Sequence, residues 1–193
     1  GSYHGFTYDR GEYGTFDAPA GVNFGLETWI WDIGATGAMT GGFTDSDGVY
    51  RGFILDNGAF TRIMVPGSAW TEGFGINARG EVTGHFANPG SSQMFGFVYR
   101  DGEFTTILDY PGEDDWMSCS MGIGVHGETV GHVAGTYPDA TYGYVWHDDT
   151  YTALLRVPEA AATYPTAIGA DGTIAGYAVL TGGERVGFVA RPK

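Results

Sequence analysis

The chain has 193 residues, enough to bury a sizeable hydrophobic core, and its repeats run from end to end, so one domain over residues 1–193 is expected. Aspartates and glutamates number 23 against nine lysines and arginines, which gives a net charge of −14. A surface this acidic repels phosphate groups, which argues against nucleic acid and membranes as partners and leaves neutral, aromatic or cationic small molecules and sugars.

A repeat of 44 to 47 residues organises the chain. Its clearest copy is residues 70–85, and the same frame fits residues 27–42, 117–132 and 162–177 without a gap. An aromatic-rich frame follows each copy and also opens the chain, and its marker glycines are Gly5, Gly52, Gly96, Gly143 and Gly187. A repeat of this length predicts a propeller blade or another repeat array.

Each repeat contains four short segments with alternating apolar and polar residues, which we label strands A to D, and none has a helical apolar period. In the copy from residue 70, strand A covers 71–77, turns at 78–80 and returns as strand B over 81–87. In the preceding frame, strand C at 52–55 leads through an Asn-Gly hairpin turn into strand D at 60–65. Two hairpins make one blade, so the sequence predicts an all-β fold, a four-bladed β-propeller of four-stranded antiparallel blades.

The repeats span about residues 5–51, 52–95, 96–142 and 143–186, with a closing strand at 187–190. The chain starts inside a repeat, with a strand C and a strand D over residues 3–17. The last blade is therefore expected to take N-terminal strands, which would close the ring. One strand C is then in excess, and the sequence leaves open which terminal copy is displaced.

Strand A is expected to be the innermost strand. One alternating set of its residues is small, and the other is bulky. Because a narrow axis admits only small side chains, the small set is predicted to line the axis and the bulky set to pack between blades. The bulky set includes Cys119, the single cysteine, so no intramolecular disulfide can form and a buried structural thiol is expected.

Residues 75–84, Gly-Ile-Asn-x-x-Gly-x-Val-x-Gly, and residues 4–8, His-Gly-Phe-x-Tyr, resemble the HAF repeats of bacterial extracellular proteins. The resemblance covers nearly the whole chain, but the other three copies lack the asparagine and only His4 keeps the histidine before Gly-Phe. It implies a β architecture and an extracellular or periplasmic location, while a cytoplasmic location stays open. It implies no defined activity, so no catalytic residue follows from it.

The long connections of the predicted propeller are the B–C and D–A loops, which lie on one face of the disc, and that face is acidic and aromatic. Its side chains either form a solvated rim with aromatic residues between blades, or surround a pocket at the axis mouth. In the second interpretation, the ligand-binding candidates are hydroxyl-bearing and aromatic residues. They are Thr28, Trp29, Trp31, Trp70, Thr71, Trp116, Ser118, Thr163 and Tyr164.

Four residues are candidates for acid or base catalysis. Asp32 is a lone carboxylate at a strand A position where the other repeats have glycine or alanine, so it is either a functional group with a raised pKa or a cap for backbone N–H groups. His85 and His132 share a strand B position and could partner it, although neutral core histidines are the alternative. Glu72 would be a second acid.

Metal ligands are weakly represented. The segment from Asp45 to Asp47 resembles the start of a calcium loop but lacks the later acidic ligand, so a plain turn is preferred and no cofactor is expected. No CxxC, HExxH, GxSxG or phosphate-loop motif occurs.

The framework glycines and isoleucines repeat, whereas the residues expected at the axis and its mouth differ among the repeats, which indicates one asymmetric site. The sequence therefore favours an enzyme that acts on a small organic molecule by general acid/base chemistry, such as a lyase, isomerase, cyclase or hydrolase. The alternative is a secreted glycan-binding or small-molecule-binding propeller without catalysis. The substrate and the oligomeric state stay open.

Overall fold

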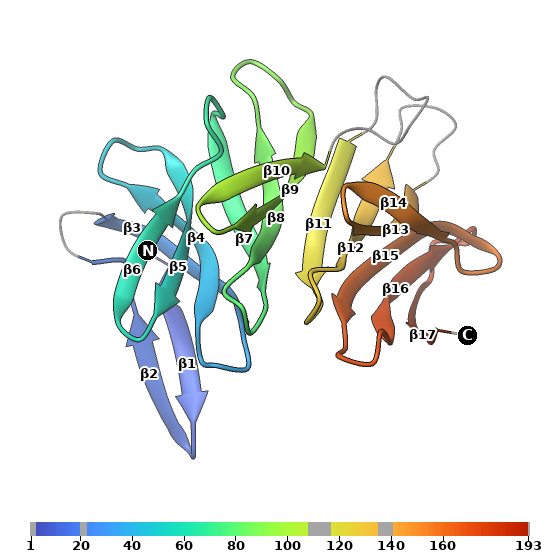
Figure 1. Ribbon diagram of the computed structural model, residues 1–193, viewed down its shortest axis with the longest axis horizontal. Helices are drawn as coiled ribbons and strands as arrows, with labels where there is room; N and C mark the ends of the chain where they lie inside the picture. Colours follow the sequence, from blue (N-terminus) through green and yellow to red (C-terminus); the bar gives the residue numbers. More distant parts are fainter. Residues whose placement is uncertain (1–2, 20–22, 108–116, 135–140, 193) are drawn as a thin grey trace.

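The computed structural model describes residues 3–19, 23–107, 117–134 and 141–192, with only the backbone described at residues 23–26 (Figure 1). All regular secondary structure in these ranges consists of β-strands, so the all-β prediction is confirmed. None of the described residues belongs to a helix that is long and apolar enough to cross a membrane.

Two antiparallel sheets each contain one complete repeat. The first sheet has the order β3-β4-β5-β6, with bounds Asn23–Ile33, Met39–Asp45, Tyr50–Asp56 and Ala59–Ile63. The second sheet has the order β7-β8-β9-β10, with bounds Trp70–Ile76, Val82–Ala87, Met94–Arg100 and Glu103–Ile107. In both sheets the strands follow the predicted order A to D.

The next two repeats share a seven-stranded sheet. Strands β11 to β14 form one repeat, with bounds Met117–Ile123, Thr129–Ala134, Thr141–His147 and Thr150–Leu155. Strands β15 to β17 supply A, B and C of the other, with bounds Ala160–Ile168, Ile174–Leu180 and Arg185–Ala190. A single parallel pair, Thr141 with Ala162, joins the two repeats.

The N-terminal strands do not complete the last repeat, so the predicted closure is wrong. Strands β1 (Gly5–Asp9) and β2 (Glu12–Phe16) form a separate hairpin, while β17 pairs with β16 in the strand C position. The hairpin contacts β3 instead, and the Tyr3 carbonyl accepts the Thr28 N–H at 3.1 Å. In Figure 1 the hairpin and the C terminus lie at opposite ends. The connection from β16 to β17 is short, so β17 takes this edge at a smaller loop-closure cost.

Every strand A contains a β-bulge at the same repeat position, which the sequence analysis did not anticipate. The pairing with strand B shifts between residues 30 and 32, 73 and 75, 120 and 122, and 165 and 167. The bulge pushes a strand A carbonyl toward a strand B glycine. A Cβ atom at any of these glycines would lie well inside 3.0 Å of that oxygen, and they are Gly41, Gly84, Gly131 and Gly176. This contact explains why these glycines repeat.

The hydroxyl-bearing residues of strand A lie between sheets, so the prediction that the small set lines the axis is wrong for these members. Thr28, Thr71, Ser118 and Thr163 are at most 1% exposed. Three of them accept a backbone N–H from the preceding connection: Thr28 from Ala18, Thr71 from Val65 and Thr163 from Val157. Ser118 donates to the Ile107 carbonyl at 2.8 Å. Small side chains are needed here because the neighbouring repeat packs closely, not because of an axis.

Hydrophobic clusters fill the space between consecutive repeats. The largest combines residues of the first two sheets: Ala38, Ile63, Val65, Ile76, Val82, Phe86 and Phe97. A second cluster joins the β7–β10 sheet to strands β11 to β14 and includes Ile107, Val133 and the fully buried Tyr144. Consecutive repeats are therefore held mainly by apolar burial.

Replacing Gly84 by alanine should destabilise the protein, because the new Cβ would collide with the Glu72 carbonyl. We expect the free energy of unfolding, measured by urea titration with circular dichroism, to fall by about 3 kcal/mol or more. Gly182→Ala is the matched control, since no atom lies within 4 Å of the Cβ it would add. Similar losses in the two variants would contradict the role of the bulge.

Candidate functional site

A row of rings crosses the first two sheets on the side of strand A that carries the bulky residues. We call it the aromatic row. Tyr3 stacks on Trp29 with ring centroids 4.7 Å apart, and Trp29 stacks on Trp31 at 5.7 Å. Trp31 stacks on Phe74 at 5.1 Å, and Phe74 stacks on the His85 ring at 4.6 Å. Trp31 remains 46% exposed, so a planar or sugar-like molecule can reach the row from solvent.

Similar contacts occur on the later repeats. The His132 and Tyr164 rings meet edge to face at 4.8 Å, and Tyr164 stacks on Tyr177 at 4.8 Å. The guanidinium of Arg185 lies 5.5 Å from the Tyr177 ring centre. Trp70 contacts the edge of the His85 ring at 5.6 Å. Of the predicted ligand-binding residues, the aromatic ones within the described ranges, Trp29, Trp31, Trp70 and Tyr164, thus share the bulky side of strand A or lie next to it.

Glu72 is the carboxyl group of the aromatic row. It extends from β7, and its Oε1 accepts hydrogen bonds from Trp31 Nε1 at 2.5 Å and from the Tyr50 hydroxyl at 2.6 Å. Burial raises the pKa of Glu72, and the two hydrogen bonds offset this only in part. The group can therefore take up a proton more readily than an exposed glutamate.

Tyr50 was missed by the sequence analysis. Its hydroxyl fills the place of a strand B side chain, because a Cβ at Gly42 would collide with it. In the other repeats, the position of Gly42 is occupied by His85, His132 and Tyr177. Burial and the negative charge of Glu72 raise the pKa of Tyr50, so it donates a proton in its hydrogen bond at neutral pH. The sequence signal for this arrangement was Gly42 itself, because a glycine at the position of His85 and His132 leaves room for a side chain from another strand.

His85 and His132 are neutral imidazoles in the folded protein. Burial lowers the pKa of each to about 4, and the nearby His132 also disfavours a charge on His85. Among the described residues, no group forms a hydrogen bond with the buried Nδ1 of either ring. His85 lies opposite Glu72 across the β7–β8 pair, and His132 lies opposite Cys119 across the β11–β12 pair. A carboxyl group and an imidazole with free hydrogen-bonding capacity are therefore cross-strand neighbours.

Cys119 is buried, as predicted. It is 4% exposed, and burial raises the pKa of its thiol to about 11. A thiol in this state is a poor nucleophile at neutral pH. It therefore adds apolar volume beside His132.

Asp32 caps backbone groups, which was the structural alternative for this residue. Its Oδ1 accepts the N–H of Ile33 at 2.8 Å, and its Oδ2 accepts the N–H of Ile76 at 2.9 Å. The second bond ties β3 to β7 in the neighbouring sheet. Asp32 therefore joins two repeats through backbone hydrogen bonds. It takes no part in the hydrogen bonds that Glu72 accepts from Trp31 and Tyr50.

A pocket of about 320 Å³ lies where the C-terminal ends of all four strands A converge. The residue at the β-bulge of each strand lines it, namely Trp31, Phe74, Met121 and Thr166. Bulges re-aim side chains, which accounts for this shared direction. Trp31 and Phe74 belong to both the aromatic row and this central pocket, so the two surfaces are continuous.

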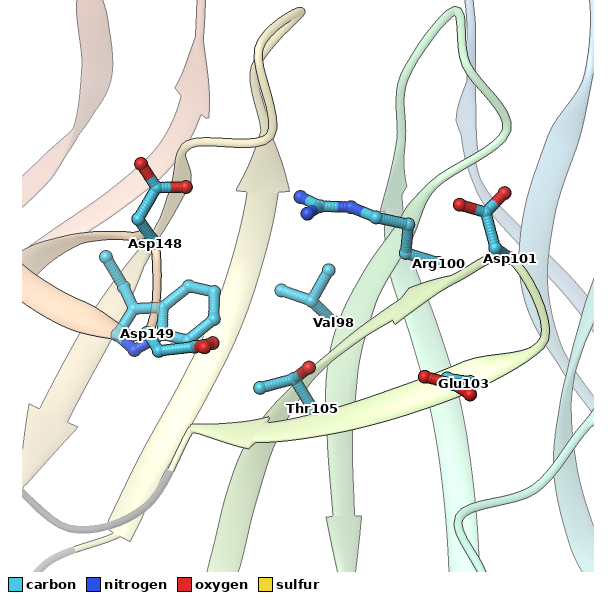
Figure 2. Close-up of a pocket in the computed structure, with 8 residues that line it drawn as sticks. Val98, Arg100, Asp101, Glu103, Thr105, Asp148 and Asp149 are labelled. Carbon is cyan, nitrogen blue, oxygen red and sulfur yellow. The ribbon is translucent and has the colours of Figure 1, made fainter.

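A second pocket, of about 260 Å³, lies between the outer strands of the second and third repeats. Its walls carry Asp101, Glu103, Asp148 and Asp149 around Val98 and Trp146 (Figure 2). Arg100 also lines it and forms an ion pair with the buried Glu81. Burial alone would raise the pKa of Glu81. Its pKa is nevertheless held below its usual range by hydrogen bonds from Arg79 and Asn77 and by the charge of Arg100. Arg100 therefore already has a carboxylate partner.

The weak calcium candidates are bound by arginines. Asp45 is 2% exposed and pairs with Arg62 at 2.8 Å and with Arg51 at 3.2 Å, while Asp47 pairs with Arg51 at 2.6 Å. Within the described ranges, no group of three or more histidines, cysteines, aspartates or glutamates is arranged to hold a metal ion. Trp116, the remaining ligand-binding candidate, lies outside the described residues.

Comparison with known proteins finds no family model and no curated protein that matches this chain. The local geometry is therefore the basis for the functional proposals.

Asp32→Asn should lower stability and leave function intact. An asparagine can accept one of the two backbone N–H groups but presents its own N–H₂ to the other, so we expect a loss of about 1 kcal/mol. Thermal unfolding and ligand binding or turnover, measured on the same preparation, check this. A variant that is fully stable but inactive would restore Asp32 as a functional carboxylate.

Acid should destabilise the protein through the two buried histidines. Their folded pKa of about 4 lies below the ordinary value of 6.5, so the stability they confer is present above 6.5 and is lost as pH falls toward 4. Each can contribute up to about 3 kcal/mol to this loss. In urea titrations across this pH range, His85→Gln with His132→Gln should flatten the dependence, whereas His126→Gln, an exposed histidine, should not. An unchanged slope in the double variant would contradict the burial argument.

Proposed function

We propose that this protein is an enzyme for a small organic molecule, with Glu72 as the general acid or base and His85 as its partner. The observation that carries the proposal is the cross-strand pair of a carboxyl group with a raised pKa and a neutral imidazole, whose Nδ1 has no hydrogen-bond partner among the described residues. The pair lies beside exposed Trp31. Groups with perturbed pKa values on a concave, partly apolar surface are typical of catalytic sites.

The chemistry follows from the protonation states. Glu72 in its ionised form is short of solvation and gains from taking a proton from a bound substrate. Tyr50 and Trp31 both donate to Oε1, so Oε2 is the oxygen that remains for that proton. The protonated Glu72 can then return that proton to another atom of the same substrate, while the neutral His85 can form a hydrogen bond with it. The net proton count is unchanged, which suits an isomerisation, a cyclisation or an elimination.

The second candidate function is binding without chemistry. It is supported by the continuous stacking of the aromatic row and by the exposure of Trp31, since sugars and planar or cationic molecules bind to such surfaces. In this case Glu72 would hydrogen-bond to the ligand or neutralise its charge. Product analysis separates the two functions, because a binding protein returns its ligand unchanged.

The predicted four-bladed propeller is retained as a proposal for the relation among the repeats. It is supported by the pocket on which the strands A of all four repeats converge. The resemblance to HAF repeats, and the extracellular or periplasmic location that it implies, remain proposals of the same kind.

Glu72→Gln should strongly lower the turnover rate while binding persists. Glutamine keeps the acceptor for Trp31 and Tyr50 but cannot carry the proton, so we expect the rate to fall by about 10²-fold or more. The substrate is first sought by thermal shift with a panel of sugars, amines and aromatic compounds, and products are then analysed by mass spectrometry. Glu184→Gln, at an exposed carboxylate, is the control.

Stability provides an independent readout for the same variant. Because the folded pKa of Glu72 is raised, its contribution to stability is present at low pH and is lost as pH rises through that pKa. Glu72→Gln should therefore gain stability relative to the wild type as pH rises. Full activity in Glu72→Gln would rule out the proposed catalysis. Unaltered turnover in Tyr50→Phe would show that the hydrogen bond from Tyr50 to Glu72 does not contribute to it.

A further inference from the structure

The two ends of the strand array are chemically complementary. At one end, β17 pairs with β16 on one side and has no strand on its other side within the described residues. At the other end, β1 and β2 pair only with each other. In the complete repeats strand C is paired on both sides, so β17 has an unpaired edge that its equivalents lack, and the hairpin has an unpaired edge on each strand. Backbone groups at such edges can form hydrogen bonds with another strand.

The missing strand types match. Strand β17 holds position C and lacks the strand D that β6, β10 and β14 supply in their repeats. Strand β2, with sequence EYGTF, resembles the strand D sequences AFTRI of β6 and EFTTI of β10. It is therefore a strand of type D whose outer edge is unpaired in the described residues. It is suited to lie antiparallel to β17, as strand D lies beside strand C in the complete repeats.

The marker glycines show which contact is absent. A Cβ at Gly5, Gly52, Gly96 or Gly143 would lie within 3.4 Å of an atom in the next strand A. At Gly187 the nearest atom belongs to Gly176 in its own sheet, 4.0 Å away. The surface of β17 that is covered in every other repeat is thus uncovered in the described structure.

Exposed apolar side chains collect at these same ends. Tyr8, Tyr13 and Phe6 on the hairpin are 61%, 78% and 65% exposed, and Val189 on β17 is 62% exposed. Phe6, Tyr8 and Tyr13 lie on one face of the hairpin, because Phe6 and Tyr8 are two residues apart and Tyr8 pairs with Tyr13. Isolated exposed residues of this kind are common on protein surfaces, whereas apolar side chains that share one face are typical of an interaction site.

The charges of the two ends are opposite. Residues 185–193 contain three basic residues, Arg185, Arg191 and Lys193, and no acid, in a chain of net charge −14. The hairpin region, residues 3–17, contains Asp9, Glu12 and Asp17 against Arg10. Opposite charges at the two ends favour contact between different ends over contact between like ends.

We propose that β17 of one copy pairs with β2 of a second copy, so that chains associate head to tail. The occupant is a second copy of this chain, because its opposite end holds a strand of the missing type, an exposed apolar face and the opposite charge. Such a heterologous contact does not close on two chains and extends to longer species or rings as concentration rises. The contact leaves Glu72 and the aromatic row unchanged, so it is independent of the proposed activity.

Two charge-reversal variants test this interface. A tail variant carries Val189→Glu and Arg191→Glu, and a hairpin variant carries Glu12→Lys and Tyr13→Lys, all at exposed positions. The wild type should show concentration-dependent growth in mass by analytical ultracentrifugation, weakened by salt. Each variant alone should associate roughly tenfold or more weakly. An equimolar mixture of the two should recover association, because each variant contributes one intact end and the two altered ends are again opposite in charge.

Three outcomes would overturn the proposal. The wild type could stay monomeric up to millimolar concentration, which would mean that the ends do not associate between chains. Each variant could retain the wild-type oligomer, which would place the interface elsewhere. The mixture could fail to associate more strongly than each variant alone, although each variant is folded by circular dichroism and thermal unfolding, which would exclude the head-to-tail polarity.

Discussion

The contact between a bulged strand A carbonyl and a strand B glycine is the constraint on which the rest of the structure depends. It occurs in all four repeats, and it removes any side chain larger than hydrogen from residues 41, 84, 131 and 176. The bulge also shifts the strand, so the residue at the bulge is directed into the central pocket in each repeat. One local backbone feature therefore sets both the repeated framework and the direction of the side chains that vary. The framework is uniform, and the pocket it surrounds is lined by Trp31, Phe74, Met121 and Thr166.

The asymmetry of the candidate site arises from a single missing side chain. Three repeats place an imidazole or a phenol at one strand B position, whereas the first repeat has Gly42 there. The space admits the Tyr50 hydroxyl, which reaches across to the Glu72 carboxyl of the next sheet. Glu72 is thus held by two residues of the neighbouring repeat, and its burial follows from the contact between sheets. A repeat protein can create a unique site in this way without changing its scaffold, because substitutions at equivalent positions alter the side chains of the site and leave the backbone framework the same.

The sequence was sufficient for the strand content, the order of strands within a repeat and the burial of Cys119, because period-2 alternation and glycine turns are local signals. It was insufficient for the direction of side chains. A bulge shifts the alternation by one residue and has no composition of its own, since its residue is Trp31, Phe74, Met121 or Thr166. The hydroxyl-bearing residues such as Thr71 lie before the bulge and were assigned to an axis for another reason: the alternation does not show that the preceding connection donates a backbone N–H to them. The interpretation of Asp32 as a backbone cap was available from the sequence, whereas Tyr50 lies 22 residues from Glu72 and could be placed beside it only by the fold.

The candidate site lies in the interior of the strand array, away from the terminal strands β2 and β17. Glu72 and His85 belong to the second sheet, Trp31 and Tyr50 to the first, and His132 to the third repeat. All six residues of β8, the strand that carries His85, are buried, whereas β2 and β17 at the ends are largely exposed. In a repeat array, interior units are stabilised by neighbours on both sides and terminal units by one, so local opening concentrates at the ends. Burying two imidazoles and a carboxyl group costs free energy that interior packing can offset. The interior repeats are therefore the part of the chain best able to keep these groups away from solvent while the terminal strands remain available for contacts.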